Sequence, residues 1–325
     1  MSLINVSDLT VELLTKNGYA KAIDSLNFSV DKGEILGIAG ESGSGKTMTA
    51  LTLLGLLPHL SHVSGSINFD NQELVGASSK KLHKVRGRNI AMVFQDPMTS
   101  LHPMLSIKTQ MTEHMLSHLK ISQNEANDRA IELLNEVRIP DPKRALESVP
   151  SQFSGGMRQR ICIAMALACE PQLLIADEPT TALDVTVQAG ILNLFRRLRD
   201  KRGLSIIFIT HDLGVMSSLT DRLLVMYAGR EVETGLTSTL LQNPRHPYTR
   251  AILDSLPDPS GNKRALKSIE GFPPELGKQP RGCAFHSRCH FARPECESNI
   301  ILPTNLTEKH RFFCSVDPLK LVGKL

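Results

Sequence analysis

Short apolar runs and helical patterns alternate along the first 240 residues of the chain. Alternation of apolar and polar residues predicts strands at 4–6, 9–13 and 23–30. Uninterrupted apolar runs predict buried strands at 35–39, 90–94, 173–176 and 205–209. Helical periodicity predicts helices at 46–57, 125–137 and 185–202, and a mainly helical region at 104–148. Short apolar strands separated by helices are typical of a layered α/β fold.

The length and the distribution of apolar residues limit where the chain works. Its 325 residues suit one large domain with an extension. No run of about eighteen apolar residues occurs, so we expect no segment to span a bilayer. Residues 1–8 lack a charged segment followed by an apolar one, which argues against a secretory signal. We therefore expect a cytoplasmic protein that other chains hold at any membrane it serves.

The composition changes after residue 240. Proline and glycine become frequent there, which predicts an irregular extension with little regular structure. The net charge of the chain is +4, and the basic excess lies in this extension. A solvated basic surface, a surface facing anionic lipid and a surface that balances a bound anionic cluster all fit this excess.

A glycine-rich loop between a predicted strand and a predicted helix fits the pattern Gly-x4-Gly-Lys-Ser/Thr. It comprises Gly40, Glu41, Ser42, Gly43, Ser44, Gly45, Lys46 and Thr47. The glycines let successive backbone N–H groups curl around a phosphate, and these amides open a helix with its positive dipole end toward the phosphate. Lys46 brings a positive charge to the β and γ phosphates, and the Thr47 hydroxyl is a ligand for Mg²⁺. The loop therefore predicts binding of ATP with Mg²⁺.

Two acidic residues end the apolar strand predicted at 173–176. A carboxylate at the carboxyl end of such a strand suits Mg²⁺, and we assign that role to Asp177. Glu178 lies one residue further, so its side chain can point toward a water molecule. We predict that Glu178 is the general base that polarises the attacking water.

A second glycine-opened helix begins at Ser154, which is a candidate N-cap before Gly155 and Gly156. Its exposed amides also suit a phosphate. One nucleotide has only one γ phosphate to serve. The second element therefore makes sense if it completes a site on another subunit.

At these residues the sequence resembles the ATPase subunits of ABC transporters, over residues 3 to about 240. The signature of that family is Leu-Ser-Gly-Gly-Gln; this chain has Phe153 and Met157 at its ends and keeps the central Ser-Gly-Gly. The resemblance implies that Ser154, Gly155 and Gly156 touch the γ phosphate of a partner's ATP.

The resemblance also implies roles for individual residues outside the signature. Gln95 matches the glutamine that senses Mg²⁺ and water and couples to the membrane subunits. Residues 181–184, ending in Asp184, match the loop that crosses the dimer interface. His211 matches the histidine that contacts the γ phosphate. Tyr19 is the candidate for the aromatic residue that stacks on adenine.

The resemblance implies a P-loop NTPase fold: a RecA-like α/β core with an antiparallel β subdomain near the N-terminus and a helical signature subdomain at about 97–163. We expect an ATPase domain at 1–240 and a cysteine-containing extension at 241–325.

Narrower motifs resemble the dipeptide and oligopeptide importers, at 94–101, 176–184, 226–229 and 245–249. Importers of nickel and other small solutes share parts of these motifs. The resemblance implies an ATPase that powers import from the cytoplasmic face of the plasma membrane. Its implied partners are a second, similar ATPase, two membrane permeases and, indirectly, an extracytoplasmic peptide-binding protein, with no nucleic acid.

Two rival functions stay open at this point. A soluble ABC ATPase of another kind usually carries two ATPase units or long coiled-coil insertions, and this sequence has neither. An ATP-sensing module without turnover would not need Glu178 and His211.

Six cysteines fall into two groups. Cys162 and Cys169 lie in an apolar helical pattern and are expected in the core. Cys283, Cys289, Cys296 and Cys314 crowd the extension, where a reducing cytosol disfavours disulfides. Their spacing lacks the close Cys pairs of most zinc sites and suits an iron–sulfur cluster. Some peptide-importer ATPases carry a [4Fe–4S] centre in a similar extension. Cluster, zinc and unligated thiols are the three interpretations, and Arg281, Arg288 and Arg293 would ease a cluster's negative charge.

Overall fold

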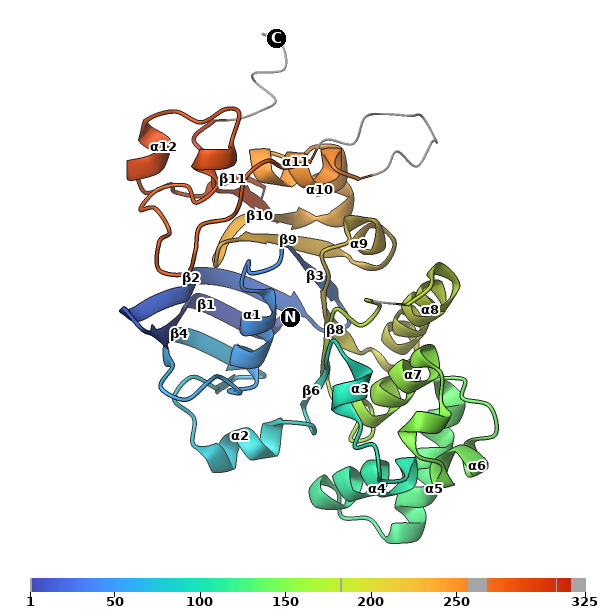
Figure 1. Ribbon diagram of the computed structural model, residues 1–325. Coiled ribbons are helices and arrows are strands. Elements are labelled where there is room, and N and C mark those ends of the chain that lie inside the picture. The colour runs from blue at the N-terminus through green and yellow to red at the C-terminus, as the bar shows by residue number, and fades with distance from the viewer. Residues whose placement is uncertain (1, 182, 257–267, 308, 317–325) are drawn as a thin grey trace. The chain divides into compact units, whose positions relative to one another are not determined.

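The computed structural model (Figure 1) describes residues 2–181, 183–256, 268–307 and 309–316. These residues fall into two compact units. The first unit contains residues 31–34 and 77–209. The second contains residues 2–30 and 35–76 together with the chain from 210 onward. No helix in these described ranges is both long enough and apolar enough to cross a membrane.

Three parallel strands form the centre of the first unit. They are β6 (Ile90–Val93), β7 (Leu173–Asp177) and β8 (Ser205–Ile209), with β7 in the middle. Every residue of β7 and β8 is buried, as expected for a parallel sheet covered on both faces. The three strands confirm the apolar runs predicted at these positions.

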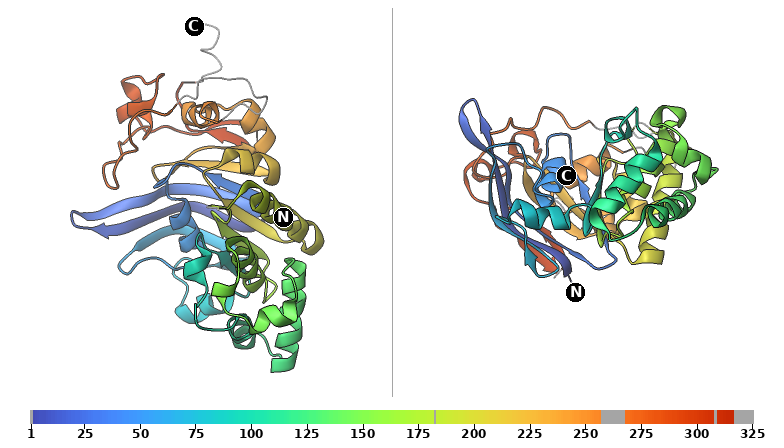
Figure 2. Two further views of the ribbon diagram at one scale, coloured as in Figure 1. Left: turned by 45° about the vertical axis from the view of Figure 1, so that its right-hand side comes forward. Right: turned by 90° about the horizontal axis from the view of Figure 1, so that it is seen from below.

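Helices make up the rest of the first unit. They are α2 (Ser79–Val85), α3 (Pro97–Ser100), α4 (Ile107–His118), α5 (Gln123–Glu136), α6 (Pro142–Glu147), α7 (Gly155–Ala166) and α8 (Val185–Arg202), with a 3₁₀ turn η1 (Pro150–Gln152). A capping box of Ser122 and Glu125 starts α5. Helices α4 to α7 lie together in all three views (Figures 1 and 2). They confirm the helical signature subdomain that the resemblance implied.

An antiparallel sheet opens the second unit. Its order is β2 (Gly18–Asp31), β1 (Ser2–Thr15), β4 (His62–Phe69) and β5 (Gln72–Glu73). Strand β1 runs through the region where two short strands were predicted, and its register with β4 shifts between Ser7 and Thr10. A β-bulge of this kind lets one strand continue past a break in the apolar alternation. This sheet is the predicted antiparallel β subdomain.

A second set of strands in this unit includes the extension. Strand β3 (Ile35–Ala39) is parallel to β9 (Arg222–Tyr227), and β9 pairs with β10 (Arg230–Leu236). The extension then adds β12 (His310–Phe312) to β10 and β11 (Thr304–Thr307) to β12. The helices of the unit are α1 (Lys46–Leu53), α9 (Leu213–Leu219), α10 (Thr237–Gln242), α11 (Pro247–Asp254) and α12 (Glu295–Ser298), with a 3₁₀ turn η2 (His286–Arg288).

The described part of the extension contains little regular structure, as predicted; the exceptions are α11, α12, β11, β12 and the 3₁₀ turn η2. Pro247 occupies the first turn of α11, where its missing N–H costs nothing, and the His246 ring accepts the Tyr248 N–H as a cap. Strand β12 pairs with β10 on one side and β11 on the other, and no local pattern reveals the pairing with β10.

A buried carboxylate joins the extension to the sheet. Glu233 on β10 is fully buried, and its two oxygens accept the N–H groups of Arg245 and His246 at 2.8 and 2.9 Å. The ring Nε2 of His310 on β12 lies 2.9 Å from the same carboxylate. Because a buried carboxylate must be hydrogen-bonded to be tolerated, these contacts fix the start of α11 and β12 on the core.

Candidate functional site

The phosphate loop has the backbone that anion binding requires. Gly40, Gly43 and Gly45 have φ values of 153°, 77° and 101°. A Cβ on Gly40 would stand 2.3 Å from the carbonyl oxygen of Met226, so only glycine fits there. Helix α1 starts directly after Gly45 without a side-chain cap, which leaves its first amides for a ligand. The predicted loop is thus confirmed as a turn that opens a helix.

Two side chains of the loop are buried in a way that suits a phosphate. The Lys46 ammonium, on a residue 5% exposed, donates to the carbonyls of Gly40 and Glu41 at 2.8 and 2.9 Å. The hydroxyl of Ser44 is buried and has no hydrogen-bond partner among the described residues. An orphaned buried hydroxyl costs free energy unless a ligand completes it. Thr47, the predicted Mg²⁺ ligand, is exposed one residue further.

The acid pair lies at the carboxyl end of β7. Asp177, the last residue of the strand, is 2% exposed. Glu178 has a φ of 45°, an uncommon conformation for a residue other than glycine, which turns the backbone sharply after the strand. Its Oε2 accepts hydrogen bonds from Gln95 Nε2 and Thr181 Oγ1, both at 3.0 Å. The structure therefore brings the predicted base and the predicted glutamine together.

The signature residues start α7 as predicted. The Ser154 hydroxyl accepts the Met157 N–H at 3.3 Å, which confirms the N-cap. Ser154 and Gly155 are exposed. A Cβ on Gly156 would stand 2.5 Å from a methyl group of Val187, so this position has no room for a side chain. The start of α7 is therefore exposed at Ser154 and Gly155.

The remaining predicted residues are surface groups. Asp184 is exposed and caps α8 by accepting the Val187 N–H at 2.9 Å, while Ala182 of the same loop lies outside the described residues. His211 is exposed just before α9. Tyr19 is 45% exposed and stacks on His62 with ring centroids 4.1 Å apart. Their roles toward ATP stay predictions.

The two units divide these groups between them. The first unit carries Gln95, the acid pair and the signature turn. The second carries the phosphate loop, Tyr19 and His211.

Sequence reasoning missed two residues that hold the phosphate loop. Tyr248 accepts the Glu41 N–H at 2.8 Å, and Arg288 forms an ion pair with the Glu41 carboxylate at 2.8 Å. In the sequence, Tyr248 stands out only as part of the motif at 245–249, and Arg288 only as the neighbour of Cys289. Neither observation indicates that Glu41 is the partner.

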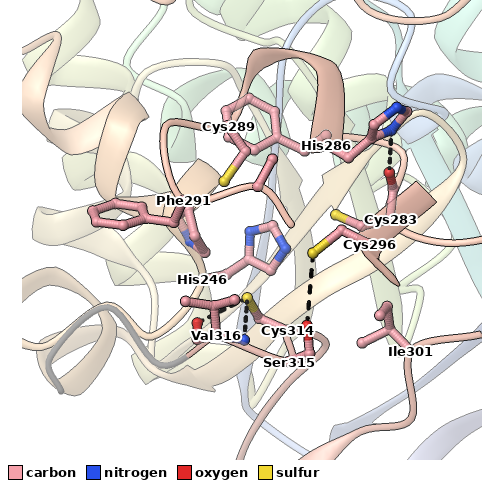
Figure 3. Close-up of a pocket in the computed structure, with 13 residues that line it drawn as sticks. His246, Cys283, His286, Cys289, Phe291, Cys296, Ile301, Cys314, Ser315 and Val316 are labelled. Carbon is pink, nitrogen blue, oxygen red and sulfur yellow. Dashed lines mark hydrogen bonds between the residues drawn. The ribbon is translucent and has the colours of Figure 1, made fainter. Parts of the chain in front are cut away.

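The four extension cysteines line one small cavity of about 10 Å³ (Figure 3). The other lining residues include His246, Phe285, Phe291, Ile301 and Val316. All four cysteines are free thiols. No three metal-binding side chains in the described ranges are grouped closely enough to hold an ion. The cavity has room for about one water molecule.

Burial favours the protonated form of three of these thiols. It raises the pKa of Cys283, that of Cys289 to about 11 and that of Cys314 to about 12. The neighbouring cysteines add to each of these shifts, because several thiolates in one apolar place repel one another. A metal cation in the cavity would instead favour the deprotonated thiolates.

Two regions of the chain match known families. Residues 23–181 match the model described as "ABC transporter", and residues 232–296 match "Oligopeptide/dipeptide transporter, C-terminal region". The oligopeptide transport ATP-binding protein OppD of Haemophilus influenzae is 45% identical over 308 residues, covering 95% of this chain and 94% of the relative. The dipeptide transport ATP-binding protein DppD of Bacillus subtilis is 44% identical over 313 residues, covering 96% and 93%.

Solved structures share the fold. A dimeric ATP-binding cassette in a post-hydrolysis state with ADP and phosphate has a TM-score of 0.64 at 27% identity, covering 72% of this chain and 98% of the cassette. CbiO1 of Clostridium perfringens, part of an ABC transporter complex, has a TM-score of 0.64 at 27% identity, covering 74% and 91%.

Proposed function

Because the chain belongs to the ATP-binding proteins of ABC transporters, whose members are ATPases, we propose that it hydrolyses ATP to power the import of short peptides. The main observation in favour of a peptide substrate is the match of residues 232–296 to the C-terminal region of oligopeptide and dipeptide transporters. The relatives named for peptide transport align over most of their length with this chain, extension included. Importers of other solutes are the alternative that the ATPase residues alone leave open.

Each residue of the site has a defined task in this proposal. Lys46 and the loop amides neutralise and orient the phosphates. Thr47 and Asp177 would provide oxygen ligands for Mg²⁺, which would offset the negative charge of the phosphates. Glu178 accepts a proton from the attacking water, and Gln95 holds the Glu178 carboxylate through their 3.0 Å hydrogen bond. His211 donates to the γ phosphate, and Tyr19 stacks on the adenine.

The signature turn serves a partner's nucleotide. Ser154 and Gly155 are exposed, which suits a group that completes a site on another subunit. The similar solved cassette is dimeric, which supports pairing of two ATPase chains. We propose a second, similar but different ATPase as the partner, with Asp184 at the interface.

The proposed domain boundaries follow from the same assignment. Residues 1–240 form the ATPase, with its helical subdomain at about 97–163, and residues 241–325 form the extension.

Membrane subunits provide the transport path in this proposal. Large apolar side chains close to Gln95 in the sequence are exposed, namely Phe94 at 43%, Met98 at 61% and Met104 at 79%. Neighbouring exposed apolar groups mark a contact surface for another protein. We propose that two permeases cover these residues at the cytoplasmic face of the membrane, while a peptide-binding protein delivers substrate on the other face.

Uptake by intact cells tests the substrate class. We expect deletion of this chain to reduce accumulation of radiolabelled tripeptides and pentapeptides to background, because the permeases lose their energy source. Accumulation of radiolabelled nickel should stay unchanged. Restoring the wild-type chain should restore peptide uptake. Loss of nickel uptake with normal peptide uptake would favour the alternative, and no change in either would point to an ATPase outside transport.

For the extension, we propose that Cys283, Cys289, Cys296 and Cys314 hold a [4Fe–4S] cluster with a structural role. The donor set supports this, because four free thiols from separate chain segments line one cavity. Bound iron would take the place of the thiol protons that burial otherwise retains. The present spacing does not suit a metal ion, so the cysteine side chains would have to turn toward one another.

Anaerobic purification tests this assignment. We expect a coloured protein with about four iron and four sulfide per chain. Cys289→Ala should lose the iron, whereas the same change at Cys169, which is buried outside the extension, should not. Zinc in place of iron would support the zinc interpretation. Colourless protein without either metal would leave four unligated thiols.

A further inference from the structure

Glu41 in the phosphate loop uses every polar group it has. Its N–H donates to the Tyr248 hydroxyl at 2.8 Å, and its carbonyl accepts the Ser44 N–H at 3.1 Å and Lys46 Nζ at 2.9 Å. Its carboxylate accepts two hydrogen bonds from Arg288, Nη1 to Oε2 at 2.8 Å and Nη2 to Oε1 at 3.1 Å. The extension therefore binds both the backbone and the side chain of Glu41 in the phosphate loop.

Arg288 is itself held in one orientation. Its side chain is 5% exposed, and it donates to the carbonyls of Ile269 and Glu270 at 3.2 and 2.9 Å. It also donates to the Tyr227 hydroxyl at 3.1 Å, and its guanidinium lies 5.8 and 5.9 Å from the ring centres of Tyr227 and Phe285. A guanidinium fixed on so many sides can hold a carboxylate without losing further side-chain freedom.

The phenol of Tyr248 adds a second fixed point. Tyr248 is fully buried, and burial raises its pKa, so the side chain stays neutral. Its ring packs against Tyr227 and Phe285, with ring centroids 4.6 and 5.2 Å away. Helix α11 thereby presents a rigid acceptor to the first turn of the phosphate loop.

The negative charge of Glu41 explains why its ion pair with Arg288 would favour ATP binding. A carboxylate in a loop that binds a triphosphate repels that ligand, and the repulsion is strong where water is partly excluded. Glu41 is the second residue of the loop, and its side chain is 28% exposed. The Arg288 ion pair offsets this negative charge and holds the carboxylate through two hydrogen bonds.

We propose that Arg288 is a positioning residue of the ATP site: through its ion pair with Glu41, the C-terminal extension neutralises the phosphate loop and holds it ready for ATP. The inference rests on the ATP site of the proposed function. It adds a task for the extension that does not depend on what the cysteines bind. It also makes ATP affinity sensitive to the fold around Cys289, the residue next to Arg288.

A double-mutant cycle tests the ion pair in the full-length chain purified with its partner subunits. Arg288→Met leaves the Glu41 carboxylate unbalanced, so we expect MgATP to bind about tenfold more weakly, which corresponds to about 1.4 kcal/mol. Glu41→Gln removes the repulsion and should weaken binding less. The double variant should bind within about threefold of Glu41→Gln, because the charge that Arg288 balanced is gone. Competition with a fluorescent ATP analogue measures each affinity.

Rescue by Glu41→Gln is the decisive readout, since general damage to the fold by Arg288→Met would not be repaired by changing the loop. Arg311 offers a matched control in the same extension. It forms a two-pronged ion pair with the buried Glu231, both contacts at 2.7 Å, and makes no contact with Glu41 in the described structure. Arg311→Met should lower the melting temperature and leave MgATP affinity unchanged.

Each outcome has a defined meaning. Wild-type affinity in Arg288→Met, or a double variant as weak as Arg288→Met alone, would overturn the positioning role. If Arg288→Met does not fold, Arg288→Lys replaces it, because lysine keeps the charge and loses the two-pronged geometry. It should bind MgATP at an intermediate affinity and be rescued in the same way. Failure of the wild-type complex to bind MgATP at all would instead contradict the proposed function.

Discussion

Replacing Glu178 by Gln is expected to stop steady ATP hydrolysis while leaving ATP binding intact. Glutamine has the same shape as glutamate but cannot accept a proton from water at neutral pH. The hydrogen bonds from Gln95 and Thr181 to Oε2, both 3.0 Å long, can be retained by an amide oxygen. The substitution therefore removes the chemistry and keeps the geometry. We expect turnover to fall by at least about 100-fold, the scale of a general base.

Phosphate release and nucleotide binding must be measured on the same preparation of the assembled complex. The matched control is Glu132→Gln, the same change at an exposed position on α5, which should hydrolyse ATP at the wild-type rate. Continued turnover in Glu178→Gln would remove Glu178 from its role as base. Loss of binding together with turnover would show that the substitution damages the site itself.

Replacing Lys46 by Ala is expected to weaken MgATP binding strongly and to abolish hydrolysis by this chain's site. The ammonium is buried and held over the loop by the carbonyls of Gly40 and Glu41 at 2.8 and 2.9 Å. Its loss removes the ammonium from both carbonyls and leaves the phosphates without their main positive charge. Charge-assisted hydrogen bonds of this kind predict that MgATP affinity falls by about 100-fold.

Equilibrium titration of MgATP measures this loss. Lys120→Ala, at an exposed position in the first unit, is the matched control and should bind normally. Lys46→Arg keeps the charge with a larger group and should recover part of the affinity at most. Full-speed hydrolysis by a complex that carries Lys46→Ala would contradict the assignment of the phosphate loop.

Local signals made much of the first 240 residues predictable. Helix α8 has the predicted ends because Asp184 caps its start and Gly203, with a φ of 63°, ends it. Helix α1 ends at Leu53, four residues earlier than predicted. The cause is Gly55, whose φ of 61° suits the left-handed turn that follows many helices. Apolar character alone had favoured a longer helix.

Long-range contacts account for what the sequence did not reveal. Arg288 and Glu41 are 247 residues apart, and no periodicity links them. The turns and helix starts that hold the site residues could be predicted, because each lies in a local motif. The contacts of the extension with the phosphate loop could not be predicted, because they depend on how α11 and η2 pack against Tyr227.

Peptide accumulation in proteoliposomes gives the most direct test of the central claim, that ATP hydrolysis by this chain drives peptide import. The complete complex is reconstituted so that this chain faces the lumen, with MgATP inside and labelled peptide and its binding protein outside. We expect the wild-type complex to accumulate peptide and the Glu178→Gln complex to accumulate none above an ATP-free control. Accumulation that persists in Glu178→Gln would contradict the account.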